Sequence, residues 1–162
     1  MAEDVTRAVV GERMLRLTSL AKVMYPATET TKGEVLHYYA RVAPVLLRHL
    51  QGRPVTRVRW PHGVAGDSFF EKNVPSGAPD WLPRARVGDV TYPLVPDVAA
   101  LTYLANLNSL EFHVPQWRLD ADGEPAPPDR LVIDLDPGRP ADLHECCIVA
   151  LAVRDRLAGL GM

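Results

Sequence analysis

The chain has 162 residues, of which 47% are hydrophobic and 23% charged, and its formal net charge is −2. This length fits one ordinary domain, and the composition supplies a core and excludes wholesale disorder. No apolar run approaches the roughly 18 residues that span a bilayer, and the first residues lack the apolar stretch of a signal peptide. We therefore expect neither a membrane protein nor a secreted one.

The charge is unevenly distributed along the chain. Residues 1–60 carry a net charge of +5, whereas residues 61–162 carry −7. A basic part favours contact with a polyanion and an acidic part favours metal binding, although a mixed, solvated surface has the same composition. The two cysteines, Cys146 and Cys147, are adjacent, which excludes a disulfide framework and favours a reducing cytoplasm.

The predicted elements alternate between strands and helices. We expect a flexible tail at 1–12, followed by a domain at 13–162. Predicted strands are 13–20, 55–60, 68–73, 90–94, 110–114 and 130–136, and predicted helices are 31–50, 97–108 and 140–160. This order predicts an α/β or α+β fold with a mixed sheet and flanking helices. Since a further strand should follow the last helix, we expect the fold to be incomplete at its C-terminus.

Local signals mark the boundaries of the first helix. Thr31 and Glu34 form a T-x-x-E capping box at its start, and Gly52 follows its end. Pro44 lies inside the apolar pattern, so we expect a kink or a break there. Residues 22–26 are expected to form a turn before the helix.

The sharpest motif is an apolar segment that ends in two aspartates, residues 131–138 (LVIDLDPG). In a strand Leu131, Ile133 and Leu135 face the core. Val132, Asp134 and Asp136 share the other side, with the two aspartates roughly 6.6 Å apart along the backbone. Two such carboxylates can hold divalent cations, although Asp-Pro-Gly is also common in turns. The motif fits sugar transfer from a nucleotide sugar or phosphoryl transfer by a polymerase or primase. It fits aspartyl-phosphate chemistry less well, because Gly138 stands where that chemistry needs Thr or Val.

A second group of residues suits a phosphate. Lys32 and Gly33 lie in the first turn of the predicted helix, and Lys22 can converge from the preceding turn. A helix N-terminus offers backbone N–H groups and a partial positive charge. The group indicates a phosphate site, while a capped helix with two solvated lysines is the alternative.

Aromatic and basic side chains on the predicted strands suit nucleic acid. Phe69 and Phe70 face opposite sides of one strand, so one ring can stack on a base while the other is buried, unless both are core residues. His113 can contact a phosphate or be structural. Arg57 and Arg59 share a strand face that can serve a phosphate backbone.

Six segments occur in the order typical of one family. They are 17–26 (LTSLAKVMYP), 31–34 (TKGE), 52–54 (GRP), 69–73 (FFEKN), 111–113 (EFH) and 134–138 (DLDPG). From about residue 13 to its end, the chain resembles the polymerase domain of bacterial ATP-dependent DNA ligase D, in the archaeo-eukaryotic primase superfamily. The resemblance implies template-directed addition of nucleotides, preferably ribonucleotides, at broken DNA ends during non-homologous end joining.

The resemblance also implies a metal and nucleotide site. Asp134 and Asp136 resemble two of the three metal-binding aspartates, with Mn²⁺ or Mg²⁺ as cofactor. His113 resembles the residue that helps to hold the incoming nucleoside triphosphate. Ku and a DNA ligase are the implied partners, and the bacterial cytoplasm, at the nucleoid, is the implied location.

Two pairs of residues resemble the DNA-contacting positions of the family. Lys22 and Lys32 resemble the pocket for the 5′-phosphate at a DNA gap or end. Phe69 and Phe70 resemble the aromatic pair that packs against the template strand.

The chain departs from the family in two respects. Ser19 stands where the family often has Asn, which weakens or replaces one contact of the phosphate pocket. Family members are nearly twice as long, and the third aspartate lies in the part without a counterpart here, so we expect this chain alone to be inactive. A non-catalytic module for 5′-phosphorylated DNA ends and a metal-dependent sugar transferase remain alternatives. An exposed sheet edge can also pair with a second copy to form a homodimer.

Overall fold

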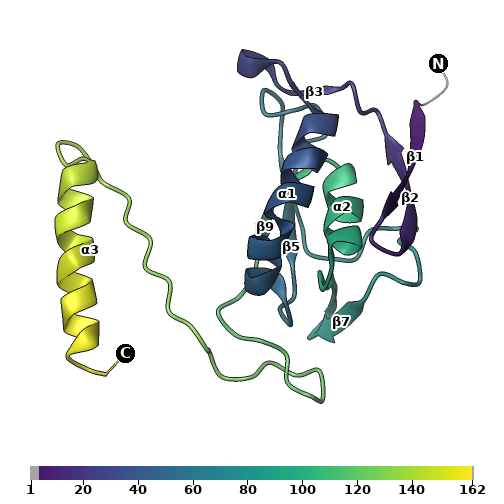
Figure 1. Cartoon of the computed structure of the whole chain (residues 1–162). Coiled ribbons are helices and arrows are strands. Elements are labelled where there is room, and N and C mark those ends of the chain that lie inside the picture. Colours follow the sequence, from purple (N-terminus) through teal and green to yellow (C-terminus); the bar gives the residue numbers. More distant parts are fainter. Residues whose placement is uncertain (1–3, 162) are drawn as a thin grey trace. The chain divides into compact units, whose positions relative to one another are not determined.

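The computed structural model describes residues 4–161 and divides them into two compact units, 4–129 and 130–161. Figure 1 shows the elements of each unit. The first unit contains β1 (Val5–Val10), β2 (Arg13–Thr18), β3 (Val23–Tyr25), a 3-10 turn (Pro26–Thr28), β4 (Thr30–Thr31), α1 (Lys32–Leu50), β5 (Thr56–Arg59), β6 (Phe69–Glu71), β7 (Arg84–Val87), β8 (Val90–Pro93), α2 (Val98–Asn106) and β9 (Ser109–His113). The second unit contains α3 (Leu143–Ala158). The predicted α+β class is confirmed, and no helix within the described residues has the length and apolarity to cross a membrane.

The strands form four small sheets where the sequence predicted one mixed sheet. The sheets are β1-β2, β3-β4, β6-β5-β9 and β7-β8, and all of their strand pairs are antiparallel. The strands are two to six residues long and are separated by turns and proline-rich segments. Proline donates no hydrogen bond to a ladder, so these segments keep the sheets small.

The expectation of a flexible tail at 1–12 is wrong for residues 5–10, which form β1, and its residues 1–3 lie outside the described part of the chain. This strand pairs with β2 along its whole length, from Val5 opposite Thr18 to Val10 opposite Arg13. Gly11 closes the hairpin at a φ of 59°, a conformation that glycine adopts without strain. The short apolar pattern of residues 5–10 is weak, and the neighbouring strand supplies the hydrogen bonds that make it a strand.

The predicted first helix is confirmed as α1, with its capping box. The Thr31 side chain accepts from the backbone N–H of Glu34, and the Glu34 carboxylate accepts from the backbone N–H of Thr31. Hydrogen bonds to the carboxylate from the Thr31 N–H and then from the Thr31 hydroxyl lower the pKa of Glu34. Of the kink or break predicted at Pro44, the break is wrong, since α1 continues through Pro44 to Leu50. Pro44 and Ala40, whose carbonyl loses its partner, are both exposed, so water can satisfy that carbonyl.

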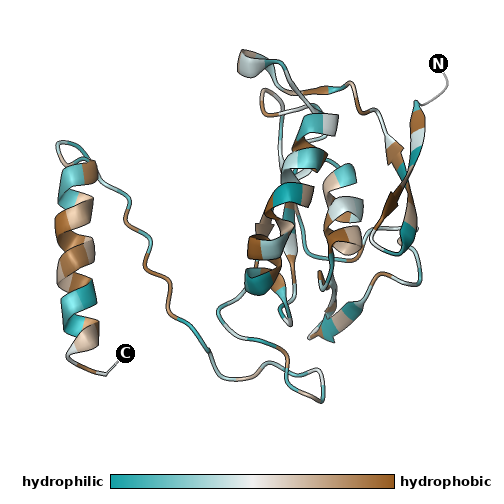
Figure 2. Cartoon of the chain, in the orientation of Figure 1, coloured by the Kyte–Doolittle hydropathy of each residue, from teal (hydrophilic) through white to brown (hydrophobic). Residues whose placement is uncertain are grey.

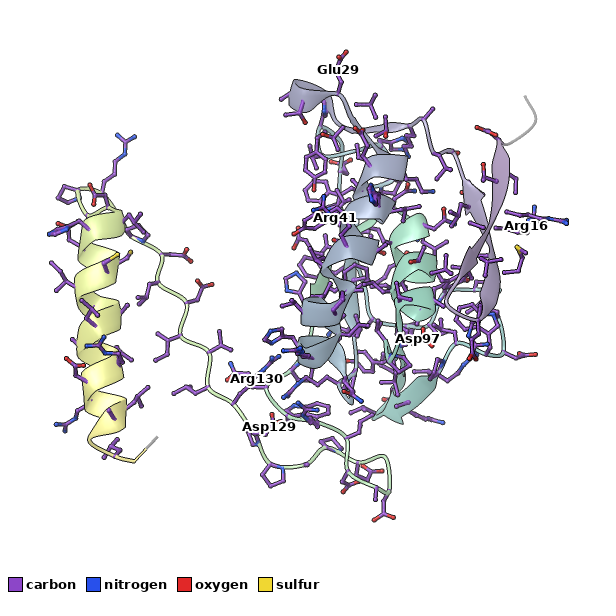
Figure 3. The ribbon with its side chains drawn as sticks, in the orientation of Figure 1. Arg16, Glu29, Arg41, Asp97, Asp129 and Arg130 are labelled. Carbon is purple, nitrogen blue, oxygen red and sulfur yellow. The ribbon has the colours of Figure 1, made fainter. Side chains whose placement is uncertain are left out.

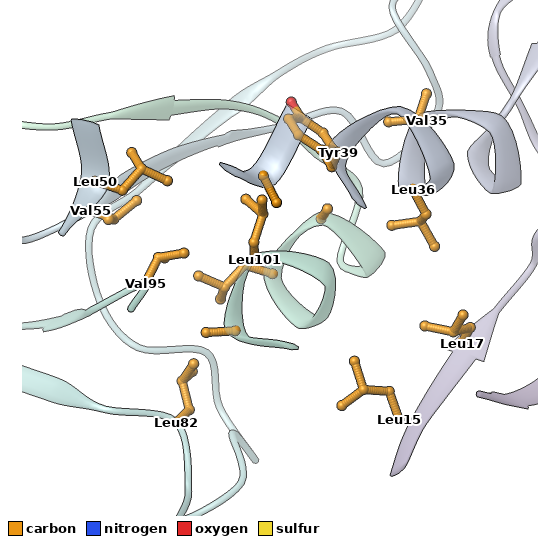
Figure 4. Close-up of a cluster of buried hydrophobic side chains, with 14 of the residues drawn as sticks. Leu15, Leu17, Val35, Leu36, Tyr39, Leu50, Val55, Leu82, Val95 and Leu101 are labelled. Carbon is orange, nitrogen blue, oxygen red and sulfur yellow. The ribbon is translucent and has the colours of Figure 1, made fainter. Parts of the chain in front are cut away.

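The core of the first unit lies where α1 and α2 pack together and against the sheets (Figure 4). Leu101 and Leu104 of α2 have no exposed surface. Tyr39 of α1 packs among these side chains and donates its hydroxyl to the Leu110 carbonyl at 2.6 Å. Burial raises the pKa of Tyr39. Because α2 packs on both α1 and β9, this core fixes the backbone of the sheet that carries several candidate residues.

An ion cluster holds the end of the first unit. Asp129, labelled in Figure 3, accepts from Arg53 at 2.5 Å and from Arg118 at 2.7 Å. Arg53 is buried and also donates to the Pro115 carbonyl at 3.2 Å. Hydrogen bonds from Arg53 and then Arg118 lower the pKa of Asp129. The cluster ties the loop at 115–129 to the start of β5.

The second unit lacks the strand that the sequence predicted at 130–136. Its residues 130–138 are extended without strand pairing, and α3 begins after a capping box formed by Asp142 and Glu145. Figure 2 shows apolar residues recurring along this segment and α3, and no described side chain of the unit is buried. A strand needs a neighbour for its backbone N–H and C=O groups, and none is present within residues 130–161.

Candidate functional site

Lys22 and Lys32 are brought together by the hairpin of β3 and β4. The backbone N–H of Lys32 donates to the Lys22 carbonyl at 2.7 Å. The Lys32 side chain is buried, with its Nζ 3.2 Å from Thr18 Oγ1. Lys22 is half-buried and its Nζ donates to the Pro61 carbonyl, while burial lowers its pKa. The two lysines thus flank the β3-β4 hairpin, Lys22 just before β3 and Lys32 as the first residue of α1.

The backbone amides at the start of α1 are already bonded. The N–H of Gly33 donates to the Leu20 carbonyl at 2.9 Å, and that of Glu34 donates to Thr31 Oγ1 at 3.3 Å. A Cβ added at Gly33 would lie 3.3 Å from the Leu20 oxygen. Gly33 therefore admits a neighbouring carbonyl, which corrects the expectation that it admits a ligand. Any phosphate bound here must be held by side chains.

Ser19 precedes the lysine pair and has a left-handed backbone with a φ of 52°. Its N–H donates to Asp4 and its carbonyl accepts from the N–H of Lys22, both at 3.0 Å. Asn adopts this conformation more readily than Ser. The left-handed backbone therefore gives a reason for the Asn that the resembled family often has where this chain has Ser19. This reason does not depend on a contact with phosphate.

Phe69 and Phe70 are 53% and 72% exposed, although we expected one ring to be buried. They lie on β6, an edge strand, so no further strand covers them. The Phe70 ring lies 6.0 Å from the His113 ring, and His113 Nε2 lies 2.8 Å from Glu111 Oε2. The outer face of the sheet therefore presents an aromatic ring beside a histidine.

The expectation that Arg57 and Arg59 serve a phosphate backbone is not supported by their contacts. Arg57 is fully buried and donates to Glu71 at 2.8 Å and to the Asn73 carbonyl at 3.0 Å. Burial lowers the pKa of Arg57, and the Glu71 carboxylate opposes this effect. Arg59 pairs with the same carboxylate and with the Leu107 carbonyl. Both guanidinium groups are engaged inside the protein.

A small pocket beside His113 contains residues that sequence reasoning missed. It has a volume of about 220 Å³ and is lined by Pro54, Thr56, Lys72, Tyr92, His113, Val114, Pro115 and Trp117. Alternation along residues 68–73 places Phe70 and Lys72 on one face. The missing information was the order of the strands, which brings Lys72 and His113 to the same pocket.

A larger apolar hollow of about 910 Å³ lies along α1. Its lining includes Tyr25, Tyr38, Val45 and Leu110. None of the residues that the sequence singled out for chemistry lines it, so its size does not make it the candidate site.

Asp134 and Asp136 line one pocket of about 360 Å³ in the second unit, together with Glu145 and Cys146. The Cys146 thiol donates to the carbonyl of Leu135, between the two aspartates, at 3.5 Å. Carboxylate oxygens are the ligands that Mg²⁺ and Mn²⁺ prefer. Within residues 4–161, however, no three His, Cys, Asp or Glu side chains are placed to hold a metal ion together. The donor type fits these metals, and Asp134 and Asp136 are candidate ligands.

The α+β fold agrees with the result of comparison with protein families. The model of the LigD primase-polymerase domain matches residues 31–162, so the chain belongs to this family. The resemblance carried by the six sequence segments is thereby confirmed.

Individual relatives are the LigD end-joining proteins of three bacteria. The chain is 48% identical over 161 residues to the "Multifunctional non-homologous end joining DNA repair protein LigD" of Mycobacterium tuberculosis, covering 94% of this chain and 21% of that protein. It is 47% identical to the Mycolicibacterium smegmatis protein, with 91% and 20% covered, and 37% identical to that of Bacillus subtilis, with 76% and 20% covered. The chain thus spans about a fifth of these relatives.

A solved structure matches the fold closely. It is the "Polymerase Domain from Mycobacterium tuberculosis Ligase D in complex with DNA", with a TM-score of 0.85 and 48% sequence identity. The match covers 91% of this chain and 54% of that domain.

Proposed function

We propose that the chain is part of a DNA end-joining repair polymerase and that its first unit binds 5′-phosphorylated DNA ends or gaps. Membership of the LigD primase-polymerase family and the match to a polymerase domain in complex with DNA support this. The observation that carries the proposal is the backbone hydrogen bond that pairs Lys22, just before β3, with Lys32, the first residue of α1.

The lysine pair suits a terminal phosphate for electrostatic reasons. A phosphate monoester carries nearly two negative charges at neutral pH and accepts strong hydrogen bonds from ammonium groups. Lys22 is partly desolvated beside the neutral Pro61 carbonyl, and a phosphate would supply its missing countercharge. After its bond to Pro61, the ammonium retains two further N–H donors. Lys32 adds a second positive charge from the buried side.

The exposed rings serve the single-stranded part of the DNA in this proposal. Phe69 and Phe70 offer stacking surfaces to template bases, which bind aromatic rings irrespective of sequence. His113 is the candidate contact for an incoming ribonucleoside triphosphate. Ku and a DNA ligase are the proposed working partners, as the resemblance to the family implies.

Asp134 and Asp136 are the candidate ligands for Mn²⁺ or Mg²⁺. A bound divalent ion would stabilise the negative charge that develops during phosphoryl transfer. Two carboxylates without a third donor bind such ions weakly. We therefore propose that this chain alone does not polymerise nucleotides.

The DNA-end proposal is tested by fluorescence anisotropy with gapped DNA carrying either a 5′-phosphate or a 5′-hydroxyl. We expect the phosphate to tighten binding roughly tenfold, the effect of one charge-assisted contact. Lys22→Ala and Lys32→Met should remove this preference, the latter keeping most of the buried aliphatic stem. Arg16→Ala, which removes an exposed cation on β2, is the matched control. Equal affinity for both DNA ends would refute the proposal.

The inactivity proposal needs both a metal-binding and an activity measurement. We expect weak Mn²⁺ binding by electron paramagnetic resonance, lost in Asp134→Asn, and no extension of a gapped primer. Robust Mn²⁺-dependent extension by the purified chain would contradict this. If the 5′-phosphate preference is present without extension, the chain acts as a DNA-end binding module. Binding of a nucleotide sugar with indifference to DNA would instead favour a sugar transferase.

A further inference from the structure

We propose that Lys72, Thr56 and His113 form a row across the sheet that binds one phosphate group of a nucleotide. The inference rests on the proposed function, because it assigns a further nucleic-acid contact to the same polymerase unit. It adds Lys72, Thr56 and the walls of their pocket to the residues that the sequence singled out.

The strand register places the three residues in one row. β5 is central, with Arg57 opposite Glu71 on one side and Thr56 opposite His113 on the other. One residue beyond Glu71 in the antiparallel direction, Lys72 comes opposite Thr56. All three residues line the same pocket. With strands about 4.8 Å apart, the backbones of Lys72 and His113 are about 10 Å apart, with Thr56 between them.

The chemistry of the row suits an oxyanion. Lys72 contributes an ammonium group, Thr56 a hydroxyl and His113 a ring nitrogen. His113 Nε2 is bonded to Glu111, so Nδ1 is the nitrogen left for a ligand. The described residues that line the pocket include no carboxylate that would repel a phosphate.

The dimensions of the pocket indicate a fragment of a nucleotide. A volume of about 220 Å³ is below the roughly 300 Å³ at which pockets for whole drug-sized ligands begin. Tyr92 and Trp117 supply rigid walls beside the row, which suit a sugar edge. Phe70 lies opposite Val58, two residues from Thr56 along β5, so it belongs to the next row on the same face. A nucleotide whose phosphate binds the Lys72 row can thus present its base toward Phe70.

The same phosphate chemistry occurs in a DNA strand and in a free nucleoside triphosphate, and the test separates these sources. Anisotropy with fluorescein-labelled oligo-dT carrying a 5′-hydroxyl measures strand binding without engaging the 5′-phosphate preference. Lys72→Gln should weaken this binding roughly tenfold and lower the slope of log K against log salt by about 0.7. Trp117→Phe, which keeps an aromatic wall, should retain the binding. Arg16→Gln, at a residue that projects outward from β2 in Figure 3, is the control that should change neither quantity.

The second arm uses calorimetry with ATP on the same variants. Loss of oligo-dT affinity alone in Lys72→Gln identifies a strand phosphate, and loss of ATP affinity alone identifies a free nucleotide. Loss of both supports a shared site. Unchanged affinity for both ligands, or an equal loss in Arg16→Gln, would overturn the inference. Since Lys72→Gln should keep any 5′-phosphate preference, failure here is distinguishable from failure of the Lys22 and Lys32 proposal.

Discussion

The two units differ in whether their apolar side chains find a partner. In residues 4–129, Val95, Leu101 and Leu104 are at most 1% exposed. In residues 130–161, Leu143, Ile148 and Leu160 remain 76%, 54% and 67% exposed. Burial of a leucine side chain stabilises a fold by about 1.5–3 kcal/mol, and no described side chain within residues 130–161 is buried. This core stabilises the first unit, and within the second unit a capping box favours α3.

This contrast shows that a good strand pattern does not suffice to make a strand. Residues 131–136 are a stronger apolar segment than residues 5–10, yet only the latter pair with a neighbour. In both segments the backbone has the same number of groups to satisfy, and an adjacent antiparallel partner decides the outcome. Substitutions in each unit test this difference.

The largest expected effect comes from truncating one leucine in each unit. Leu101→Ala removes a fully buried side chain and should cost about 3 kcal/mol of unfolding free energy through lost burial and a cavity. Leu151→Ala, on a side chain that is half-exposed in α3, should change it by less than about 0.5 kcal/mol. Urea unfolding followed by far-ultraviolet circular dichroism measures both. A cost above about 2 kcal/mol for Leu151→Ala would mean that α3 is packed against a partner.

Sequence reasoning predicted the elements of the first unit well where signals are local. The capping box at Thr31 is such a short-range signal, and α1, α2 and β2 lie within the residue ranges predicted for them. The strands β1, β3, β4 and β7 were missed, with β3 lying where a turn was expected at 22–26, because their hydrogen-bond partners, not their own patterns, define them. The predicted strand at 130–136 was wrong for the converse reason.

The sequence pattern singled out the types of residue in the candidate site but not the contacts between them. The Lys22 and Lys32 spacing around a turn indicated that the two would converge. The partner of Arg57, however, depends on the register between β5 and β6, which brings Glu71 beside it. Likewise, Lys72 joins His113 only because β5 lies between their strands. Long-range pairing is therefore the information that the sequence pattern lacked.

A smaller effect is expected from the ion cluster that ends the first unit. Because the pKa of Asp129 is lowered in the folded state, its contribution to stability is complete above about pH 4, near the unfolded value, and is lost as the pH falls through the lower folded value. Asp129→Asn should reduce the unfolding free energy at neutral pH and flatten this acid limb. Urea titrations between about pH 2 and pH 7 measure it. Glu34→Gln is a control, because the pKa of the Glu34 carboxyl in the α1 capping box is also lowered. An unchanged acid limb in Asp129→Asn would contradict the assignment of this limb to Asp129.

The smallest expected effect concerns Ser19, whose carbonyl accepts from the N–H of Lys22 in the proposed phosphate site. Since Ser19 has a φ of 52°, Ser19→Asn should stabilise the first unit by roughly 0.5 kcal/mol, because Asn tolerates the left-handed region better. That gain corresponds to a rise in Tm of roughly 2–4 °C. Thermal unfolding without DNA isolates the backbone effect, and Ser19→Gly, which removes the side chain and tolerates the same φ, is its control. If Asn raises the preference for a 5′-phosphate while Gly does not, the amide also contacts the phosphate. If Asn leaves the Tm unchanged, the left-handed backbone is not the reason for Asn at this position.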